Sequence, residues 1–239
     1  LFFNSTANAF KETITDIPGA TWASAANLNT AGTNAAGATA GSQTAALVFA
    51  GDRPVRVTAT EKWDGTSWTT VNAMSTGRNN LGGAGVTTSA LGFGGGTPSY
   101  TADTEEYNGS TWSEGGDLNS ARQTTGAGSS NSAALAVGGY DPGNVTDKVE
   151  QYNGSSWTEI AEINTARYII NNTGTVTSML GAGGQPHNAS VESWDGTSWS
   201  ETTDLGTAKS GGYNSGTSLS ALYSGGNASP GNIANCEFW

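Results

Sequence analysis

The chain has 239 residues, of which only 12% are charged and 35 are glycine, and this length is compatible with one all-β domain. The net charge of −11 argues against binding to nucleic acid or to an anionic membrane surface, because both require clusters of Lys and Arg. The single cysteine, Cys236, excludes an intrachain disulfide and a cysteine-based zinc site. No apolar run is long enough for a membrane-spanning helix. From the acidic charge and the lack of such a run, we expect neither nucleic-acid partners nor membrane insertion. Because the chain starts without Met and without a signal-peptide pattern, we expect it to be a piece of a longer protein.

A repeat marked by tryptophan runs through the chain. Five tryptophans recur at intervals of 42 to 46 residues: Trp22, Trp68, Trp112, Trp157 and Trp199. After each comes an apolar residue with a small polar cluster, as at 118–120, and then a strand of small residues. An alternating apolar strand that ends in a glycine pair follows, as at 134–139. An internal repeat of this period indicates a repeat architecture.

A tight turn precedes the tryptophan in four copies. The turns are Asp64-Gly65, Asn108-Gly109, Asn153-Gly154 and Asp195-Gly196, each between two strand-like segments. Asn, Asp and Gly tolerate a positive φ, so these dipeptides predict β-hairpins. Each copy therefore holds four short strands in some 44 residues, which is typical of a propeller blade.

We accordingly predict an all-β fold, a single five-bladed β-propeller domain with four antiparallel strands in each blade. The expected blades cover approximately residues 30–74, 75–118, 119–163, 164–205, and 206–239 together with 13–29. The innermost strands consist of Gly, Ala, Ser and Thr. Five blades leave a narrow centre, where large side chains would collide.

The glycine pair, the later aromatic residue and the tryptophan together resemble the kelch repeat. The glycine pairs are at 94–95, 138–139, 183–184 and 225–226, and Ala50-Gly51 is a weaker version in the first copy. The resemblance covers nearly the whole chain and implies a kelch-like propeller. The repeats, rich in Gly, Ser, Thr and Asn, also resemble those of kelch-like proteins in phage and aquatic bacterial sequences.

The two ends of the chain are predicted to close the ring. The strand around Trp22 precedes every set of inner strands, and the last set ends at Trp239 without a fourth strand. Pairing these ends would leave no open sheet edge. Thr13–Ile17 and Asn235–Trp239 compete for the third-strand position beside Trp22, and the C-terminal segment is favoured because it carries Glu and Trp in register. Residues 1–12 have no predicted place.

Candidate ligand-binding residues lie in the loops that vary between copies. Each loop between the second and third strands contains a proline, at 54, 98, 142, 186 and 230, which fits ordinary turn chemistry. Propellers usually bind partners through such scaffold-held loops, where an aromatic ring offers an apolar face to a sugar and amides or carboxylates supply hydrogen bonds. The candidate residues are Tyr100, Tyr140, Asp141, Asn144, His187, Asn188 and Asn227.

Charged residues also recur in register. The cations are Arg78, Arg122, Arg167 and Lys209, with Gly32 at the equivalent place in the first copy. The glutamates are Glu61, Glu105, Glu150, Glu192 and Glu237, each two residues before an aromatic residue and therefore on the same strand face, between blades. We predict structural ion pairs, because a buried carboxylate needs a partner. The alternative is a ring of cations that binds an anion at the channel mouth.

The sequence favours binding over catalysis. Kelch-like propellers include copper oxidases related to galactose oxidase, whose metal needs histidine ligands and a cysteine-linked tyrosine. This chain has only His187 and Cys236, so we expect no metal and no cofactor. Asp103, Asp141 and Asp147 near the loops leave calcium as an alternative, although no dense run of oxygen ligands is present.

Three functions follow as hypotheses. The first is a non-catalytic, lectin-like recognition or adhesion module, extracellular or virion-associated, that binds a glycan or surface polymer through the variable loops. The second is a structural component of a virion or envelope that serves as a docking platform for a protein partner. The third is a glycan-processing enzyme with paired carboxylates. We favour the first, by analogy with other kelch-like repeats.

Overall fold

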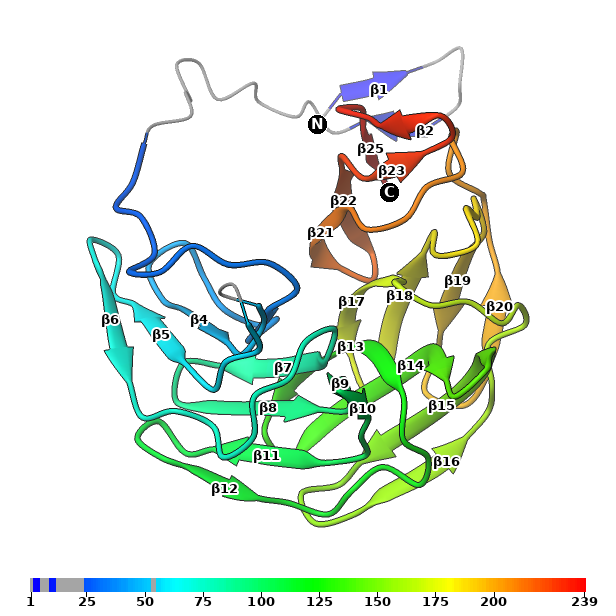
Figure 1. Ribbon diagram of the computed structural model, residues 1–239. Helices are drawn as coiled ribbons and strands as arrows, with labels where there is room; N and C mark the ends of the chain where they lie inside the picture. Colours follow the sequence, from blue (N-terminus) through cyan, green and yellow to red (C-terminus); the bar gives the residue numbers. More distant parts are fainter. Residues whose placement is uncertain (1, 5–8, 12–23, 53–54) are drawn as a thin grey trace.

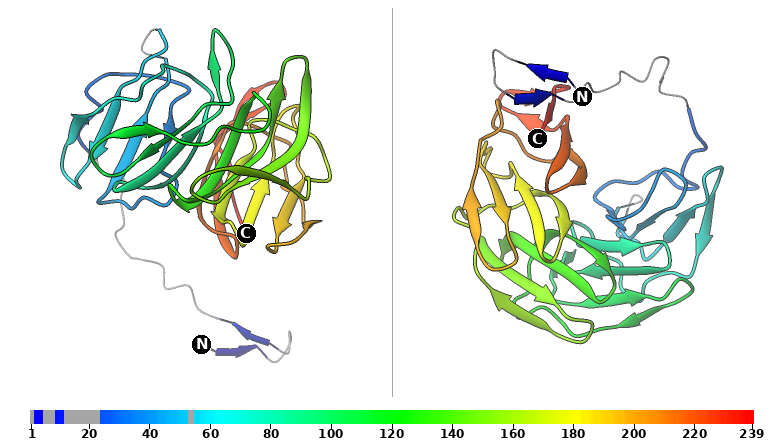
Figure 2. Two further views of the ribbon diagram at one scale, coloured as in Figure 1. Left: turned by 90° about the horizontal axis from the view of Figure 1, so that it is seen from below. Right: turned by 180° about the vertical axis from the view of Figure 1, so that it is seen from behind.

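Five antiparallel sheets follow one another around a ring. The computed structural model describes residues 2–4, 9–11, 24–52 and 55–239, and these residues form strands and turns without a helix. Figure 1 shows the sheets arranged around a common centre in chain order, and Figure 2 shows the same order from behind. The fold is a five-bladed β-propeller, as the repeat predicted.

The first four blades each contain four antiparallel strands. The first blade consists of β3 (Ala36–Gly37), β4 (Ala46–Phe49), β5 (Thr60–Trp63) and β6 (Trp68–Val71). The second consists of β7 (Gly82–Val86), β8 (Ser89–Phe93), β11 (Thr104–Tyr107) and β12 (Trp112–Glu114). The third consists of β13 (Gln123–Ser130), β14 (Ala133–Asp141), β15 (Asn144–Tyr152) and β16 (Trp157–Ile160). The fourth consists of β17 (Asn171–Thr175), β18 (Ser178–Ala182), β19 (Val191–Trp194) and β20 (Trp199–Glu201).

The fifth blade has three strands among the described residues. These are β21 (Tyr213–Thr217), β22 (Ser220–Ser224) and β25 (Cys236–Phe238), and β25 pairs with β22. The C-terminal segment thus occupies the third-strand position. Short hairpins rise from the second and fifth blades: β9 (Gly96–Thr97) with β10 (Ser99–Tyr100), and β23 (Asn227–Ala228) with β24 (Gly231–Asn232).

The predicted closing strand around Trp22 and its competitor at 13–17 lie outside the described residues. Residues 24–29 are described and form no strand. The N-terminal residues, for which the sequence predicted no place, include β1 (Phe2–Asn4) and β2 (Ala9–Lys11), which pair with each other.

The predicted hairpins form through side-chain oxygens. In the first blade, Oδ1 of Asp64 accepts the backbone N–H groups of Thr66 and Ser67, both at 2.8 Å. Asn108, Asn153 and Asp195 repeat this pattern, so Asn and Asp are interchangeable at the turn. The glycine that follows has a positive φ each time, for example 98° at Gly65. The dipeptide signal therefore has a direct structural cause.

Small residues in the inner strands allow the blades to approach closely at the centre. A Cβ atom at Gly83 of the second blade would lie 2.3 Å from the carbonyl oxygen of Gly37 in the first. A Cβ atom at Gly126 would lie 2.8 Å from the Phe93 ring in the preceding blade. Glycine is needed at both positions, at Gly83 because a side chain would collide with the neighbouring blade, and at Gly126 because a Cβ atom would also lie 2.0 Å from the Leu135 carbonyl oxygen of its own blade.

Tryptophans from the outer strands fill the space between blades. The Trp112 ring lies 4.9 Å from Phe49 of the preceding blade, and the Trp157 ring lies 4.8 Å from Phe93. The indole N–H of Trp157 also donates to Thr104 Oγ1 at 2.9 Å. The regular spacing of tryptophan in the sequence thus reflects the packing of each blade on the one before it.

Candidate functional site

The site lies on the face formed by two sets of connections, which we call the loop face. One set joins the second and third strands of a blade, and the other joins the fourth strand to the next blade. Isolated β-bridges hold the two sets together, at Asn79 with Gly96, Tyr168 with Gln185, and Ser210 with Asn227. The loops are therefore fixed to each other and to the strands beneath them.

Three tyrosines from three successive blades form a row on this face. The Tyr100 and Tyr140 ring centroids are 5.9 Å apart, and those of Tyr140 and Tyr168 are 5.3 Å apart. All three side chains are half-buried. The structure thus brings together two of the predicted residues and adds Tyr168, which the sequence analysis missed because it lies beside the Arg series rather than in a variable loop.

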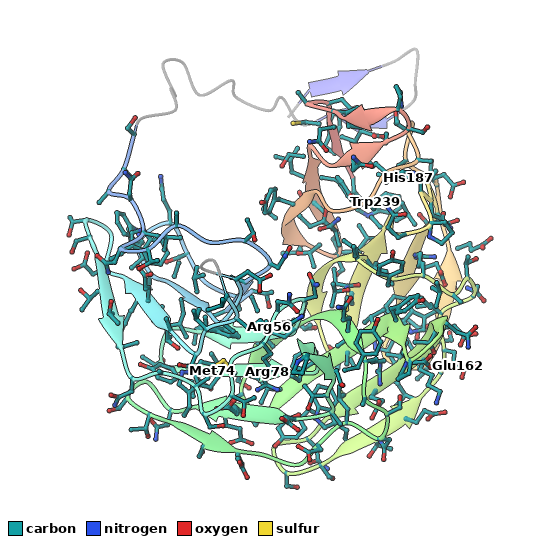
Figure 3. The ribbon with its side chains drawn as sticks, in the orientation of Figure 1. Arg56, Met74, Arg78, Glu162, His187 and Trp239 are labelled. Carbon is teal, nitrogen blue, oxygen red and sulfur yellow. The ribbon has the colours of Figure 1, made fainter. Side chains whose placement is uncertain are left out.

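A second polar group lies where the fourth and fifth blades meet. His187 Nε2 is 2.7 Å from Asn227 Oδ1, and Gln185 Nε2 donates to Ser210 Oγ at 2.7 Å. Figure 3 shows His187 beside the β23–β24 hairpin of the fifth blade. Gln185, Ser210, Asn227 and Ile169 line a cavity of about 430 Å³. Two more of the predicted residues therefore meet, at a place separate from Tyr100 and Tyr140.

The remaining predicted residues support loop structure. Asp141 and Asn144 pair with each other across the turn between β14 and β15, so the predicted loop at 140–144 is the tip of a long hairpin. Two long strands continue to this point because Pro142 and Gly143 make a two-residue turn, in which Gly143 has a φ of 120°. Asn188 Oδ1 accepts the backbone N–H of Ser190 at 2.6 Å.

A further cavity of about 360 Å³ lies where the segments that enter the inner strands of the five blades meet, which we call the channel-mouth cavity. All five blades contribute to its lining, each through residues at or just before its inner strand. The lining contains four amide side chains and two tyrosines: Asn34, Asn80, Gln123, Asn171, Tyr168 and Tyr213. None of the residues that line it is acidic or basic. Sequence reasoning missed these residues because they lie at the starts of the inner strands, where the repeat predicted only small residues.

One carboxylate lies just behind this cavity. Asp52 Oδ2 accepts hydrogen bonds from the amides of Asn79, at 2.8 Å, and Asn34, at 3.1 Å. These two hydrogen bonds, with the Arg56 charge, hold the pKa of Asp52 below its usual value. Asp52 therefore stays ionised and orients the Asn34 amide at the cavity wall.

The recurring cations are paired with the recurring glutamates in the second to fifth blades. The Arg78–Glu105, Arg167–Glu192 and Lys209–Glu237 pairs have N–O distances of 3.0, 2.6 and 2.9 Å, and Arg122 contacts Glu150 in the same way. All four cationic side chains are fully buried, and Figure 3 shows Arg78 among the strands of the second blade. Their charge is neutralised inside the blades, so a ring of cations that binds an anion is not formed.

The same glutamates also tie consecutive blades together. Oε2 of Glu105 accepts the backbone N–H of Ser75, and Oε2 of Glu150 accepts that of Asn119, both at 2.7 Å. Glu61 accepts the N–H of Asn29 at the same distance. Each donor lies in the segment that enters the blade from the preceding one. In the second to fifth blades a single carboxylate therefore fixes the cation of its own blade and the incoming chain.

Within the described part of the chain, no group of three or more His, Cys, Asp or Glu side chains is placed to hold a metal ion, so Asp103, Asp141 and Asp147 do not converge on a calcium site. The described residues also contain no helix suited to crossing a bilayer.

Comparison with models of known protein families finds no match, and comparison with curated proteins finds none either.

Proposed function

We propose that this chain is a non-catalytic recognition module of the kelch-like type, which binds a glycan or a surface polymer through its loop face. The observation that carries this proposal is the row of Tyr100, Tyr140 and Tyr168, contributed by three different blades. A scaffold-held row of aromatic rings suits an extended chain of sugar units, because each ring offers an apolar face to the C–H side of a pyranose.

The polar groups beside the row suit the same ligand. Amide side chains at Asn80, Gln123 and Asn227 present both donors and acceptors, which match the paired hydroxyls of a sugar. Among the described residues, tyrosine is the one kind of ionisable residue in the lining of the two loop-face cavities described above. This lining accords with binding of a ligand without a catalysed reaction. An extracellular or virion location, by resemblance to phage repeats, belongs to this proposal.

A docking platform for a protein partner is the second candidate, and one observation favours it. The fifth blade exposes two large apolar side chains that are paired across β22 and β25, Leu222 at 42% and Phe238 at 87% exposure. Contiguous exposed apolar side chains often mark a protein interface.

The test is a glycan array probed with the whole chain and with a Tyr100→Ala/Tyr140→Ala double variant. Phe238→Ala is the matched control, since it removes an exposed aromatic ring from the fifth blade outside the row. We expect sugar binding that falls at least tenfold in the double variant, at about 1.4 kcal/mol per factor of ten, and that the control retains. Circular dichroism verifies that each variant is folded.

Sugar binding that survives in the double variant would contradict the assignment to the loop face. Absence of binding to any sugar would contradict glycan recognition and favour the docking platform.

A further inference from the structure

Ile169 is held in a backbone conformation that its side chain disfavours. Its φ is 53°, in the left-handed region. The equivalent residues of the first, second and fifth blades also have a positive φ, but they are Asn34, Asn80 and Gly211, which accept it at little cost. For a β-branched residue this conformation is a genuine outlier that costs on the order of 1–3 kcal/mol.

Burial of the Ile169 side chain is too incomplete to explain this cost. Ile169 is 39% exposed, whereas the next residue, Ile170, is buried in the core between the third and fourth blades. Ile169 lines both the channel-mouth cavity and the cavity beside Asn227. An aliphatic side chain therefore lies where two cavities lined in part by amide side chains adjoin. Strained residues of this kind cluster at ligand sites.

The groups around Ile169 offer hydrogen bonds in both directions. Among the described residues, the side-chain amides of Asn80 and Gln123 have no partner, so their donors and acceptors are free. The Asn171 Nδ2 group donates to Tyr223 Oη at 2.7 Å, which leaves its Oδ1 as an acceptor. Tyr168 and Tyr213 add ring faces and hydroxyls on the same cavity.

The site also lacks a charge suited to an anionic ligand. The four recurring cations are fully buried and paired with glutamates: Arg78, Arg122, Arg167 and Lys209. Asp52 stays ionised behind Asn34, and the neighbouring Arg56 carries the opposite charge, so this pair adds no net charge beside the cavity. An uncharged ligand with hydroxyl or amide groups and one apolar substituent fits these features.

We infer that the loop face recognises an uncharged sugar that carries a methyl group, and that Ile169 is the residue that contacts this methyl. The inference rests on the proposed function and specifies the class of its ligand. Two chemical sources supply such a methyl: the acetamido group of an N-acetylhexosamine, and the C6 methyl of a 6-deoxyhexose. In both sugars the methyl lies beside polar groups. This arrangement matches the cavity, in which the Ile169 side chain lies beside amide side chains.

The experiment is calorimetric titration of the whole chain with matched sugar pairs. One pair is N-acetylglucosamine and N-formylglucosamine, which differ only by a methyl group in place of a hydrogen, and the other is L-fucose and L-galactose. Burial of one methyl group predicts that at least one methyl-bearing sugar binds about fourfold more tightly than its parent. The pair that shows the preference identifies the source of the methyl.

Ile169→Asn introduces the residue that the first two blades have at this position. We expect it to abolish the methyl preference and to leave the unfolding midpoint equal or higher, because Asn tolerates the positive φ. Ile169→Val keeps an aliphatic contact and retains the preference. Leu219→Asn, at an exposed residue outside the loop-face cavities, is the control and changes neither quantity.

Three results would overturn the inference. Equal binding of both members of each pair contradicts a methyl site while leaving glycan recognition intact. A loss of stability in Ile169→Asn together with unchanged preference assigns Ile169 a packing role only. Absence of binding to any sugar in the array contradicts both this inference and the proposed function.

Discussion

The third and fifth blades each have a leucine at the same position of the repeat, but one leucine is a core residue and the other is a surface residue. Leu135 in β14 and Leu222 in β22 occupy the same position of the repeat, three residues before the glycine pair. Leu135 is fully buried, whereas Leu222 is 42% exposed. Leu135 packs with Ile170 and Met179 of the fourth blade, but no apolar cluster of described residues joins the fifth blade to the first. The repeat specifies the leucine, and the next blade decides whether it is buried.

The ion pairs differ between these blades in the same way. Arg122 and Glu150 of the third blade are both inaccessible to solvent, whereas Glu237 of the fifth blade remains 24% exposed beside Lys209. Burial of Lys209 is nevertheless complete. The fifth blade therefore retains the chemistry of the repeat with less shielding from water.

The largest effect is expected from breaking the buried ion pair. Arg122→Met leaves the Glu150 carboxylate buried without its cation, which costs about 3–5 kcal/mol of unfolding free energy. Lys209→Met costs less, because solvent reaches Glu237. Urea denaturation of the two variants measures the difference, and equal losses would contradict the contrast between the blades.

Truncating the two leucines tests the comparison directly. Leu135→Ala should cost about 2–5 kcal/mol through lost burial and the cavity left behind. Leu222→Ala should cost clearly less, since almost half of its side chain is already in water. Thermal and urea unfolding of both variants provide the measurement. A loss at Leu222 as large as that at Leu135 would show that the fifth blade is covered in solution.

A smaller effect concerns the tryptophans between blades. Trp157 Nε1 donates to Thr104 Oγ1. Trp199 Nε1 is buried without a hydrogen-bond partner in the described structure. In the blade that precedes Trp199, Val149 stands at the repeat position of Thr104. Thr104→Val should therefore cost about 1–3 kcal/mol by leaving an indole N–H unpaired.

The converse change, Val149→Thr, should stabilise the chain by up to about 1 kcal/mol by supplying the missing acceptor. Trp199→Phe is the control, because without the indole N–H the gain from Val149→Thr should vanish. A gain that persists in that background would show that the hydroxyl acts through another contact.

The smallest effect is a pH dependence confined to two turns. Hydrogen bonds to the carboxylates of Asp64 and Asp195 lower the pKa of each from 3.8 to about 2. A lowered pKa means that the turn stabilisation is present above about pH 4 and is lost as the pH falls through 2. The matching turns at Asn108 and Asn153 have no such dependence. NMR titration of wild type and Asp64→Asn provides the test, and an unshifted Asp64 would contradict it.

Much of the fold was predictable because its signals are local. The Asn-Gly and Asp-Gly turns and the period-two strands reflect contacts within a blade, and the spacing of tryptophan reflects the same contact repeated between neighbouring blades; the structure confirms five blades. Even the departure at Ala50 follows the pattern, since its φ of 59° matches the 63° of Gly94. Tyr168 and Ile169 were not predicted as site residues, because their neighbours come from blades distant in the sequence.

The sequence by itself determined the number of blades, the strands within them and the residue types that recur at each position. These properties depend on backbone preferences and on contacts between residues close in the chain. Only the tertiary structure decided which loop residues meet, where the channel-mouth cavity lies, and that Ile169 is strained and exposed. Those properties arise between blades, and each depends on the relative placement of repeats that are nearly alike in sequence.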